Sequence, residues 1–289
     1  MTNPRLDSLL AAADEALVRP SVNGYRGPVR VGVDLGTAYT VMFVLDAEGD
    51  PLLGTYEFAE VVRDGLVVDF VGAIALVRTL KARLEERLGR EIERAATAYP
   101  PGVPVAEVRA TRHVLEAAGL ECTALVDEPT AANEVLQVRD GAVVDVGGGT
   151  TGIAVIEDGR IVHTADEPTG GTHFTLVIAG AHRISIESAE ALKTDPREQG
   201  RLFPVVRPVM EKVATIVGRH LAGRAVNSVY LAGGTSAFPG LAEVVTEVTG
   251  IPAFVPGKPL FVTPLGIALH DTEAARTPGG AASHASLRN

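Results

Sequence analysis

The chain has 289 residues, a hydrophobic fraction of 46% and one cysteine, Cys122. This composition predicts a globular protein of one large or two medium domains, and a single cysteine excludes an internal disulfide or a zinc site. The net charge of −10, the lack of any basic run and the lack of an 18-residue apolar stretch argue against nucleic acid or membrane as partners and favour the cytoplasm.

The first predicted element is an amphipathic helix over residues 5–18. Its leucines and Ala13 follow the spacing of one helical face. A linker rich in proline and glycine follows at 20–28, because these residues mark turns. The helix is expected either to dock on the rest of the chain or to bind a partner.

The remaining predicted elements alternate between strands and helices, which indicates an α/β fold with layered sheets. Strands are predicted at 29–33, 40–45, 95–99, 122–126 and 228–232, helices at 72–88, 105–118, 130–138, 186–193, 204–222 and 238–249, a loop at 127–129 and a hairpin at 141–165. The tail from residue 277 onward is rich in glycine, alanine and serine and is predicted to be flexible.

One pattern occurs twice in the chain. The segments VGVDLGTAYTVMFVLDAEG, around Asp34, and AVVDVGGGTTGIAVIEDG, around Asp145, share one order of residues. Each reads as a strand, an aspartate, an apolar residue, a glycine, small and hydroxyl-bearing residues, and a second strand that ends in an acidic turn. Such internal similarity indicates a duplicated domain, with each half opening on the same hairpin.

Both loops suit a magnesium ion and phosphate. Small residues leave the backbone N–H groups open to phosphate oxygens, and an aspartate at the end of a strand can hold Mg²⁺, usually through waters. A hairpin capped by aspartate is the alternative for either loop alone, but the matched pair favours phosphate binding. The pattern predicts Asp34 and Asp145 as metal ligands and catalytic residues, and the phosphate cradles as Gly36, Thr37 and Ala38 in one loop and Gly147, Gly148, Gly149 and Thr150 in the other.

Two further motifs lie at the ends of predicted strands. Asp127, Glu128 and Pro129 precede a helix, where they are either an ordinary helix start or a site at which Glu128 polarises an attacking water. The segment LAGGTSAFPGL at 231–241 carries a pair of glycines, which allow the close approach of a flat ligand or a phosphate.

In this order, these motifs resemble those of the actin/Hsp70/sugar-kinase ATPase superfamily. DLGT at 34–37 and DVGGGTT at 145–151 resemble its phosphate motifs, and GGTHF at 170–174 resembles the glycine pair that follows the second of them. EPTAA at 128–132 and TPLGIAL at 263–269 resemble its connecting motifs. LAGGTSAFPGL resembles its adenosine motif. The resemblance implies ATP or ADP with Mg²⁺ in a compact two-lobed fold of duplicated ribonuclease-H-like domains with small or missing inserted subdomains. The implied lobes are 29–140 plus 260–271 and 141–259, followed by a flexible tail over 272–289. The further nucleotide-binding residues that it implies are Gly170, Gly171, Thr172, Glu190, Lys193, Gly233, Gly234 and Thr235.

Within the superfamily, the chain resembles the EutJ family of ethanolamine utilisation proteins. The matching segments are VVRDGLVVDFVGAIALVR at 61–78, AATAYPPG at 95–102, ADEPTGGTHFTLVIAGAHRISIESAE at 165–190 and the N-terminal helix. This resemblance implies a chaperone or reactivating ATPase associated with bacterial microcompartments, whose client is a cobalamin-dependent lyase or another microcompartment enzyme. The N-terminal helix and its linker also resemble the peptides that target cargo to microcompartment shells, which implies that residues 5–18 bind a shell protein, with docking on its own lobe as the alternative. The protein is expected in the cytoplasm or in the microcompartment.

Two departures from the Hsp70 pattern indicate slow hydrolysis. Gly152 stands where Hsp70 proteins carry an acidic residue, and the lysine between Asp34 and Glu128, Lys81, is predicted on an exposed helix face instead of at the site. An actin-like scaffold that uses nucleotide as a switch, with little turnover, is therefore the alternative. A sugar or acyl-acid kinase ranks last, since the first lobe offers no base for a hydroxyl acceptor.

Overall fold

The structure is a computed structural model that describes residues 4–19, 22, 24–63, 65–103 and 105–272. Its helices are α1 (Pro4–Val18), α2 (Phe70–Leu88), α3 (Val105–Ala117), α4 (Glu128–Leu136), α5 (Gly171–His182), α6 (Ile186–Thr194), α7 (Pro196–Leu221), α8 (Leu241–Thr249) and α9 (Val262–Leu269). Its strands are β1 (Arg30–Leu35), β2 (Tyr39–Leu45), β3 (Pro51–Phe58), β4 (Val62–Arg63), β5 (Leu66–Val67), β6 (Arg94–Tyr99), β7 (Glu121–Asp127), β8 (Gly141–Val146), β9 (Thr151–Glu157), β10 (Arg160–Glu167), β11 (Val229–Ala232) and β12 (Ala253–Phe254).

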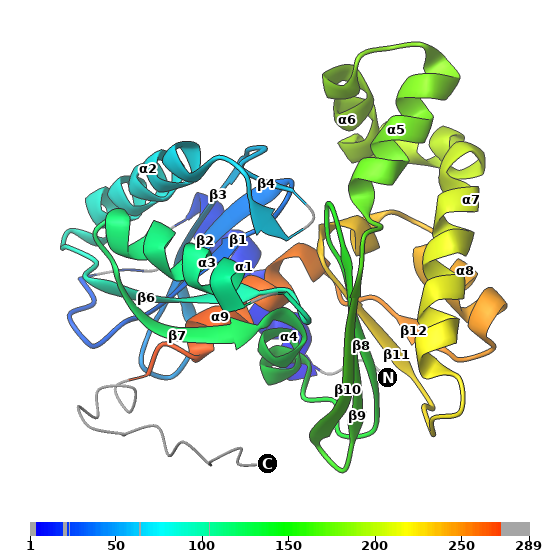
Figure 1. Cartoon of the computed structure of the whole chain (residues 1–289). Coiled ribbons are helices and arrows are strands. Elements are labelled where there is room, and N and C mark those ends of the chain that lie inside the picture. Colours follow the sequence, from blue (N-terminus) through cyan, green and yellow to red (C-terminus); the bar gives the residue numbers. More distant parts are fainter. Residues whose placement is uncertain (1–3, 20–21, 23, 64, 104, 273–289) are drawn as a thin grey trace, which may run out of the picture.

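Two five-stranded sheets with the same topology form the two lobes in Figure 1. Their strand orders are β3-β2-β1-β6-β7 and β10-β9-β8-β11-β12. In each sheet the first three strands form an antiparallel meander, and the last two run parallel to the first strand. The identical order confirms the predicted duplication. The insertions within the described residues are small: the β4–β5 pair in the first lobe, and α5 with α6 in the second.

Helices α4 and α9 lie between the two sheets (Figure 1). A hydrophobic cluster at this position contains Val41 from β2, Val143 from β8, Val135 from α4 and Leu265 from α9, all of them buried. Because residues of both sheets share this core, the inner faces of the lobes are packed through these helices. The relative position of the lobes therefore depends on how α4 and α9 pack.

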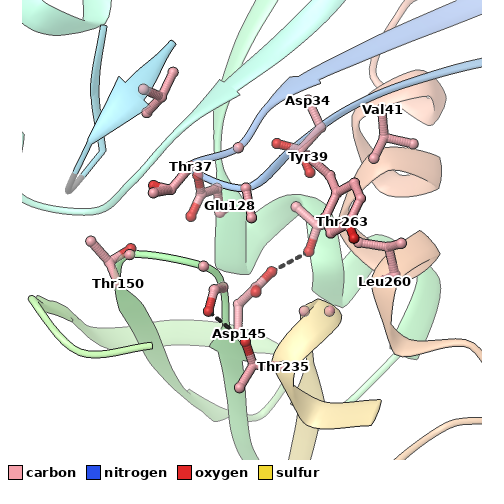
Figure 2. Close-up of a pocket in the computed structure, with 18 of the residues that line it drawn as sticks. Asp34, Thr37, Tyr39, Val41, Glu128, Asp145, Thr150, Thr235, Leu260 and Thr263 are labelled. Carbon is pink, nitrogen blue, oxygen red and sulfur yellow. Dashed lines mark hydrogen bonds between the residues drawn. The ribbon is translucent and has the colours of Figure 1, made fainter. Parts of the chain in front are cut away.

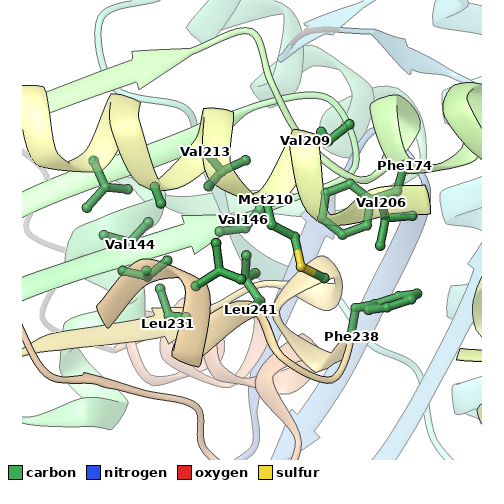
Figure 3. Packing of buried hydrophobic residues seen from close by; sticks show 14 of the residues in the cluster. Val144, Val146, Phe174, Val206, Val209, Met210, Val213, Leu231, Phe238 and Leu241 are labelled. Carbon is green, nitrogen blue, oxygen red and sulfur yellow. The ribbon is translucent and has the colours of Figure 1, made fainter. Parts of the chain in front are cut away.

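The outer face of the second sheet is covered mainly by α7, as Figure 3 shows for its core. Helix α7 buries Val206, Met210, Val213 and Val217, which follow helical spacing and lie against strand residues such as Val144. Pro204 lies inside the helix, where it cannot donate a backbone hydrogen bond. The prediction that a helix begins at 204 was therefore wrong, since burial of one apolar face carries the helix back to Pro196.

The N-terminal helix α1 is docked on the rest of the chain. Leu10 and Ala13 are buried in the cluster between the sheets. The Arg87 guanidinium donates to carbonyl oxygens near the C-terminal end of α1, at 3.3 and 3.2 Å. Asp14 also forms an ion pair with Lys258, at 2.9 Å. The helical face that carries the apolar residues is thus occupied by the protein's own core.

Other predicted elements need corrections. Strand β3 and helix α5 were not predicted, the hairpin at 141–165 is a three-stranded meander, and α4 begins at Glu128 instead of after a loop. The Lys81 side chain is only 13% exposed and pairs with Glu85 at 2.8 Å. In the predicted linker, Tyr25 donates a hydrogen bond to the Pro28 carbonyl oxygen, while residues 20, 21 and 23 lie outside the described residues. The predicted tail, apart from residue 272, also lies outside the described residues. The lobe boundaries stay predictions.

Candidate functional site

The two predicted phosphate loops are the same turn. In the first loop, the Gly36 N–H donates to the Tyr39 carbonyl oxygen at 3.2 Å. In the second, the Gly147 N–H donates to the Thr150 carbonyl oxygen at 3.0 Å, at the same offset along the chain. Because each turn follows the central strand of its sheet, the duplication places the two loops in equivalent positions of the two lobes.

The loops meet across the boundary between the lobes. An ideal Cβ atom on Gly148 would lie 2.9 Å from the Cβ atom of Ala38 and 3.0 Å from its backbone nitrogen. Real Cβ atoms do not approach that closely, so the contact requires glycine at 148. The two cradles therefore face each other directly, as expected for loops that hold one ligand from both sides.

A cavity of about 270 Å³ lies beside the loops, and Figure 2 shows Asp34, Glu128 and Asp145 around it. These carboxylates come from the end of β1, the start of α4 and the end of β8, so both sheets contribute. The predicted residues that line the cavity are Asp34, Gly36, Thr37, Ala38, Glu128, Asp145, Gly147, Gly148, Gly149, Thr150, Glu190, Lys193, Gly233, Gly234 and Thr235.

The other predicted residues, Gly170, Gly171 and Thr172, lie at the start of α5, which contacts the second loop through backbone hydrogen bonds. The Gly171 N–H donates to the Gly147 carbonyl oxygen at 2.9 Å, and the Thr172 N–H donates to that of Gly148 at 2.8 Å. Gly170 precedes them as the residue before α5. These bonds satisfy carbonyl groups of the loop. They do not bring the three residues to the cavity lining, although Thr172 lines a neighbouring cavity.

Burial and mutual repulsion govern the three central carboxyl groups. Burial, and then the nearby charge of Asp145, raises the pKa of Asp34 to about 7. The same causes hold the pKa of Glu128 well above its usual value, with burial first and then the charges of Asp145, Asp34, Asp166 and Asp127. Burial also raises the pKa of Asp145, although a hydrogen bond from Thr263 opposes that rise. Such a site gains strongly from a bound cation, which lowers the cost of keeping several carboxylates ionised.

Two of the residues that line the cavity, Glu190 and Lys193 on α6, form one network with Thr175. The Lys193 ammonium pairs with the Glu190 carboxylate at 2.6 Å and donates to the Thr175 hydroxyl at 3.0 Å. The Thr175 hydroxyl donates in turn to Glu190 at 2.6 Å. Burial lowers the pKa of Lys193, and the Glu190 charge opposes that change. The network therefore holds a charged pair at the lining of the cavity.

Several residues at the site were not predicted from the sequence. Thr263 donates a hydrogen bond to Asp145, and Tyr39, Tyr56 and Leu260 line the cavity. Asp166 pairs in register with Gly152, and an ideal Cβ atom on Gly152 would lie 3.9 Å from the Asp166 Oδ1 atom. Asp166 thus brings an acidic group from the neighbouring strand to the side of Gly152.

The donor set fits a magnesium ion that is held partly by the protein. Hard cations prefer carboxylate oxygens, and Mg²⁺ usually keeps several waters and binds one or two carboxylates together with substrate phosphates. In the part of the chain that the structure describes, no group of three or more histidine, cysteine, aspartate or glutamate residues could hold a metal. Asp34 and Asp145, one from each sheet, are the carboxylates that would offer oxygen atoms to such an ion. Within the same residues, no helix is long and apolar enough to cross a membrane.

Known proteins resemble this chain in both sequence and fold. The family model described as cell division protein FtsA matches residues 142–285, and the model described as MreB/Mbl protein matches residues 55–195. Ethanolamine utilization protein EutJ of Escherichia coli is 44% identical over 249 residues, which cover 86% of this chain and 88% of that protein. The crystal structure of EutJ from Carboxydothermus hydrogenoformans superimposes with a TM-score of 0.86 at 49% identity and covers 92% of this chain and 98% of its own.

More distant structures share the fold. The crystal structure of MreB5 of Spiroplasma citri bound to ADP superimposes with a TM-score of 0.69 at 17% identity and covers 85% of this chain and 96% of its own. At that identity the likeness concerns the fold, which is the actin-like two-lobed α/β fold.

Proposed function

Because this chain belongs to the EutJ family of ethanolamine utilisation proteins and has an actin-like fold, we propose that it binds ATP with Mg²⁺ between its lobes. In this proposal it acts as an Hsp70-like chaperone or reactivating ATPase of ethanolamine utilisation. The observation that carries the proposal is the convergence of Asp34, Glu128 and Asp145 from both sheets beside two facing glycine loops. Repulsive carboxylates beside open backbone N–H groups suit a cation with bound phosphates.

The proposed roles follow the position of each group. The carboxylates of Asp34 and Asp145 hold the metal, whose charge neutralises the phosphate oxygens when it is bound. The backbone N–H groups of both loops bind phosphate oxygens, and Gly233, Gly234 and Thr235 with Glu190 and Lys193 surround the nucleoside. The MreB5 structure with ADP supports nucleotide as the ligand, because that protein shares the fold.

Glu128 is the residue proposed to act on water. A carboxylate there accepts a hydrogen bond from the water, whose oxygen forms a bond to the γ-phosphorus while the bond to the bridging oxygen breaks. The proton of the water passes to Glu128, and ADP and inorganic phosphate leave. A positioned acid or base of this kind contributes about 10²- to 10⁴-fold to a rate.

Turnover of ATP tests this proposal. Glu128→Gln is expected to lower kcat by at least about a hundredfold, because the amide cannot accept the proton. Asp145→Ala is expected to abolish turnover through loss of metal binding. The measurement is steady-state phosphate release with Mg²⁺, with folding of each variant checked by circular dichroism. Full turnover by the Glu128→Gln variant would rule out its role in the reaction.

A second candidate function is a nucleotide-gated scaffold with little turnover. The matches to the FtsA and MreB models favour it, as does Lys81, whose ammonium pairs with Glu85 and which does not line the cavity. This candidate predicts that ATP binds without turnover and makes the protein sediment as an assembly. Unchanged sedimentation with and without ATP would exclude it.

The client and the location are proposed from the family alone. The proposed client is a cobalamin-dependent lyase or another microcompartment enzyme, reached in the cytoplasm or in the microcompartment. Binding of a shell protein by residues 5–18 requires release of α1, because Leu10 is packed in the protein's own core. If α1 targets shells, deletion of residues 1–19 abolishes co-purification with them, and unchanged co-purification contradicts that role.

A further inference from the structure

We propose that Thr263 is a positioning residue that orients the Asp145 carboxylate and connects it to helix α9. The inference rests on the proposed binding of a magnesium nucleotide and adds a residue to it. The Thr263 hydroxyl donates to the Asp145 Oδ2 atom, as the dashed line in Figure 2 shows. Both residues are nearly inaccessible to solvent, with exposed fractions of 3% for Thr263 and 7% for Asp145.

The carboxylate of Asp145 is held on two sides. Its Oδ2 atom accepts the bond from Thr263, and its Oδ1 atom lies so close to Gly233 that an ideal Cβ atom there would overlap it. A carboxylate held in this way cannot rotate freely, so its oxygens keep one direction relative to the cavity. Fixed orientation of a ligand by a hydrogen bond from a neighbouring residue raises metal affinity.

The hydrogen bond also joins the two lobes. Thr263 lies in the first turn of α9, whereas Asp145 lies next to the last residue of β8, the central strand of the second sheet. Further along α9, an ideal Cβ atom on Gly32 of β1 would lie 2.8 Å from the Ala268 Cα atom and 2.8 Å from the Pro264 carbonyl oxygen. Strand β1 carries Asp34, so one helix contacts the strand of one carboxylate and bonds to the other carboxylate directly.

This arrangement makes the separation of the two carboxylates depend on α9. Because α9 packs tightly on β1, a shift of Asp145 relative to Asp34 must either break the Thr263 bond or move the helix. The role needs a hydroxyl donor at 263, which serine retains and valine lacks. Serine and valine therefore separate hydrogen bonding from packing at this position.

The test compares the wild-type protein with the variants Thr263→Val and Thr263→Ser. Calorimetric titration gives the affinity for ADP with Mg²⁺ and with EDTA in its place. Loss of one hydrogen bond that orients a metal ligand is expected to lower the Mg²⁺-dependent gain in affinity by about 10- to 100-fold in Thr263→Val. The affinity in EDTA stays within about twofold, and Thr263→Ser behaves like the wild type.

Each other outcome has a distinct meaning. An unchanged Mg²⁺ effect in Thr263→Val, or equal damage in Thr263→Ser, overturns the positioning role. Absence of ADP binding by the wild-type protein overturns the proposed function together with this role. If Thr263→Val does not fold, Thr263→Ala replaces it with the same expectation. In an Asp145→Asn background, the Thr263 variant is expected to lower the Mg²⁺ effect no further, because the two residues act as a unit.

Discussion

Replacement of Gly266 by alanine is expected to destabilise the protein by at least about 3 kcal/mol. Gly266 lies in α9 where that helix crosses α4, and an ideal Cβ atom there would overlap the backbone carbonyl group of Ala131. A backbone carbonyl cannot move aside as a flexible side chain can, so the two helices must separate. Because their crossing forms the core between the sheets, the separation also disturbs β1 and the position of Asp34.

Urea unfolding followed by circular dichroism measures this effect, and Gly180→Ala is the matched control. Gly180 lies inside α5 with no atom within 4 Å of its ideal Cβ position. Alanine there is expected to raise the free energy of unfolding by about 0.5–1 kcal/mol, because glycine loses more backbone entropy in a helix. An unfolding midpoint of Gly266→Ala equal to that of the wild type would contradict the close packing of α4 against α9.

The second large effect is expected from Asp34→Asn in the absence of metal and nucleotide. Burial and the charge of Asp145 raise the pKa of the Asp34 carboxyl group from 3.8 to about 7 in the folded protein. Since the folded-state pKa lies above the unfolded one, the contribution of this group to stability is fully present below pH 3.8. This contribution is lost as the pH rises through about 7, and the free energy of unfolding falls by about 4 kcal/mol as a result.

Asparagine removes the ionisation and with it this loss of stability. The Asp34→Asn variant is therefore expected to have a higher free energy of unfolding than the wild type at pH 8. At pH 5 the difference between the two proteins is smaller by roughly 2–3 kcal/mol. Urea unfolding in EDTA at both pH values gives the two differences. The exposed Asp50→Asn variant controls for the loss of one negative charge. An advantage of Asp34→Asn that does not change between pH 5 and pH 8 would contradict the raised pKa.

The turns of the two loops could be predicted from sequence because the residues that form them are close together along the chain. An aspartate at the end of a strand, followed by glycine and small residues, fixes the turn within a few residues, and the duplication supplied a second copy of the same pattern. The helix α5 could not be predicted in the same way. Its sequence, GTHFTLVIAGAH, is rich in β-branched residues and glycine, and burial of Phe174 and Ile178 against the core of the second lobe decides its form.

Contacts between distant parts of the chain explain the residues of the site that the sequence did not indicate. Thr263 meets Asp145 only because α9 returns between the sheets after the whole second lobe has been formed. Asp166 reaches the neighbourhood of Glu128 through the register of β10 on β9, which a single sequence does not specify. Strand β3 begins with Pro51 and contains Gly54, both weak strand formers, and it is stabilised by pairing with β2.

Binding of a magnesium nucleotide between the lobes is tested by calorimetric titration of ATP with Mg²⁺ into the wild-type protein and into Asp145→Asn, with Asp50→Asn as the control. We expect one bound nucleotide per chain in the wild type and in the control, and an affinity at least about tenfold lower in Asp145→Asn. The reverse result, with Asp145→Asn binding as tightly as the wild type or no binding by the wild-type chain, would contradict a magnesium nucleotide held between the two lobes.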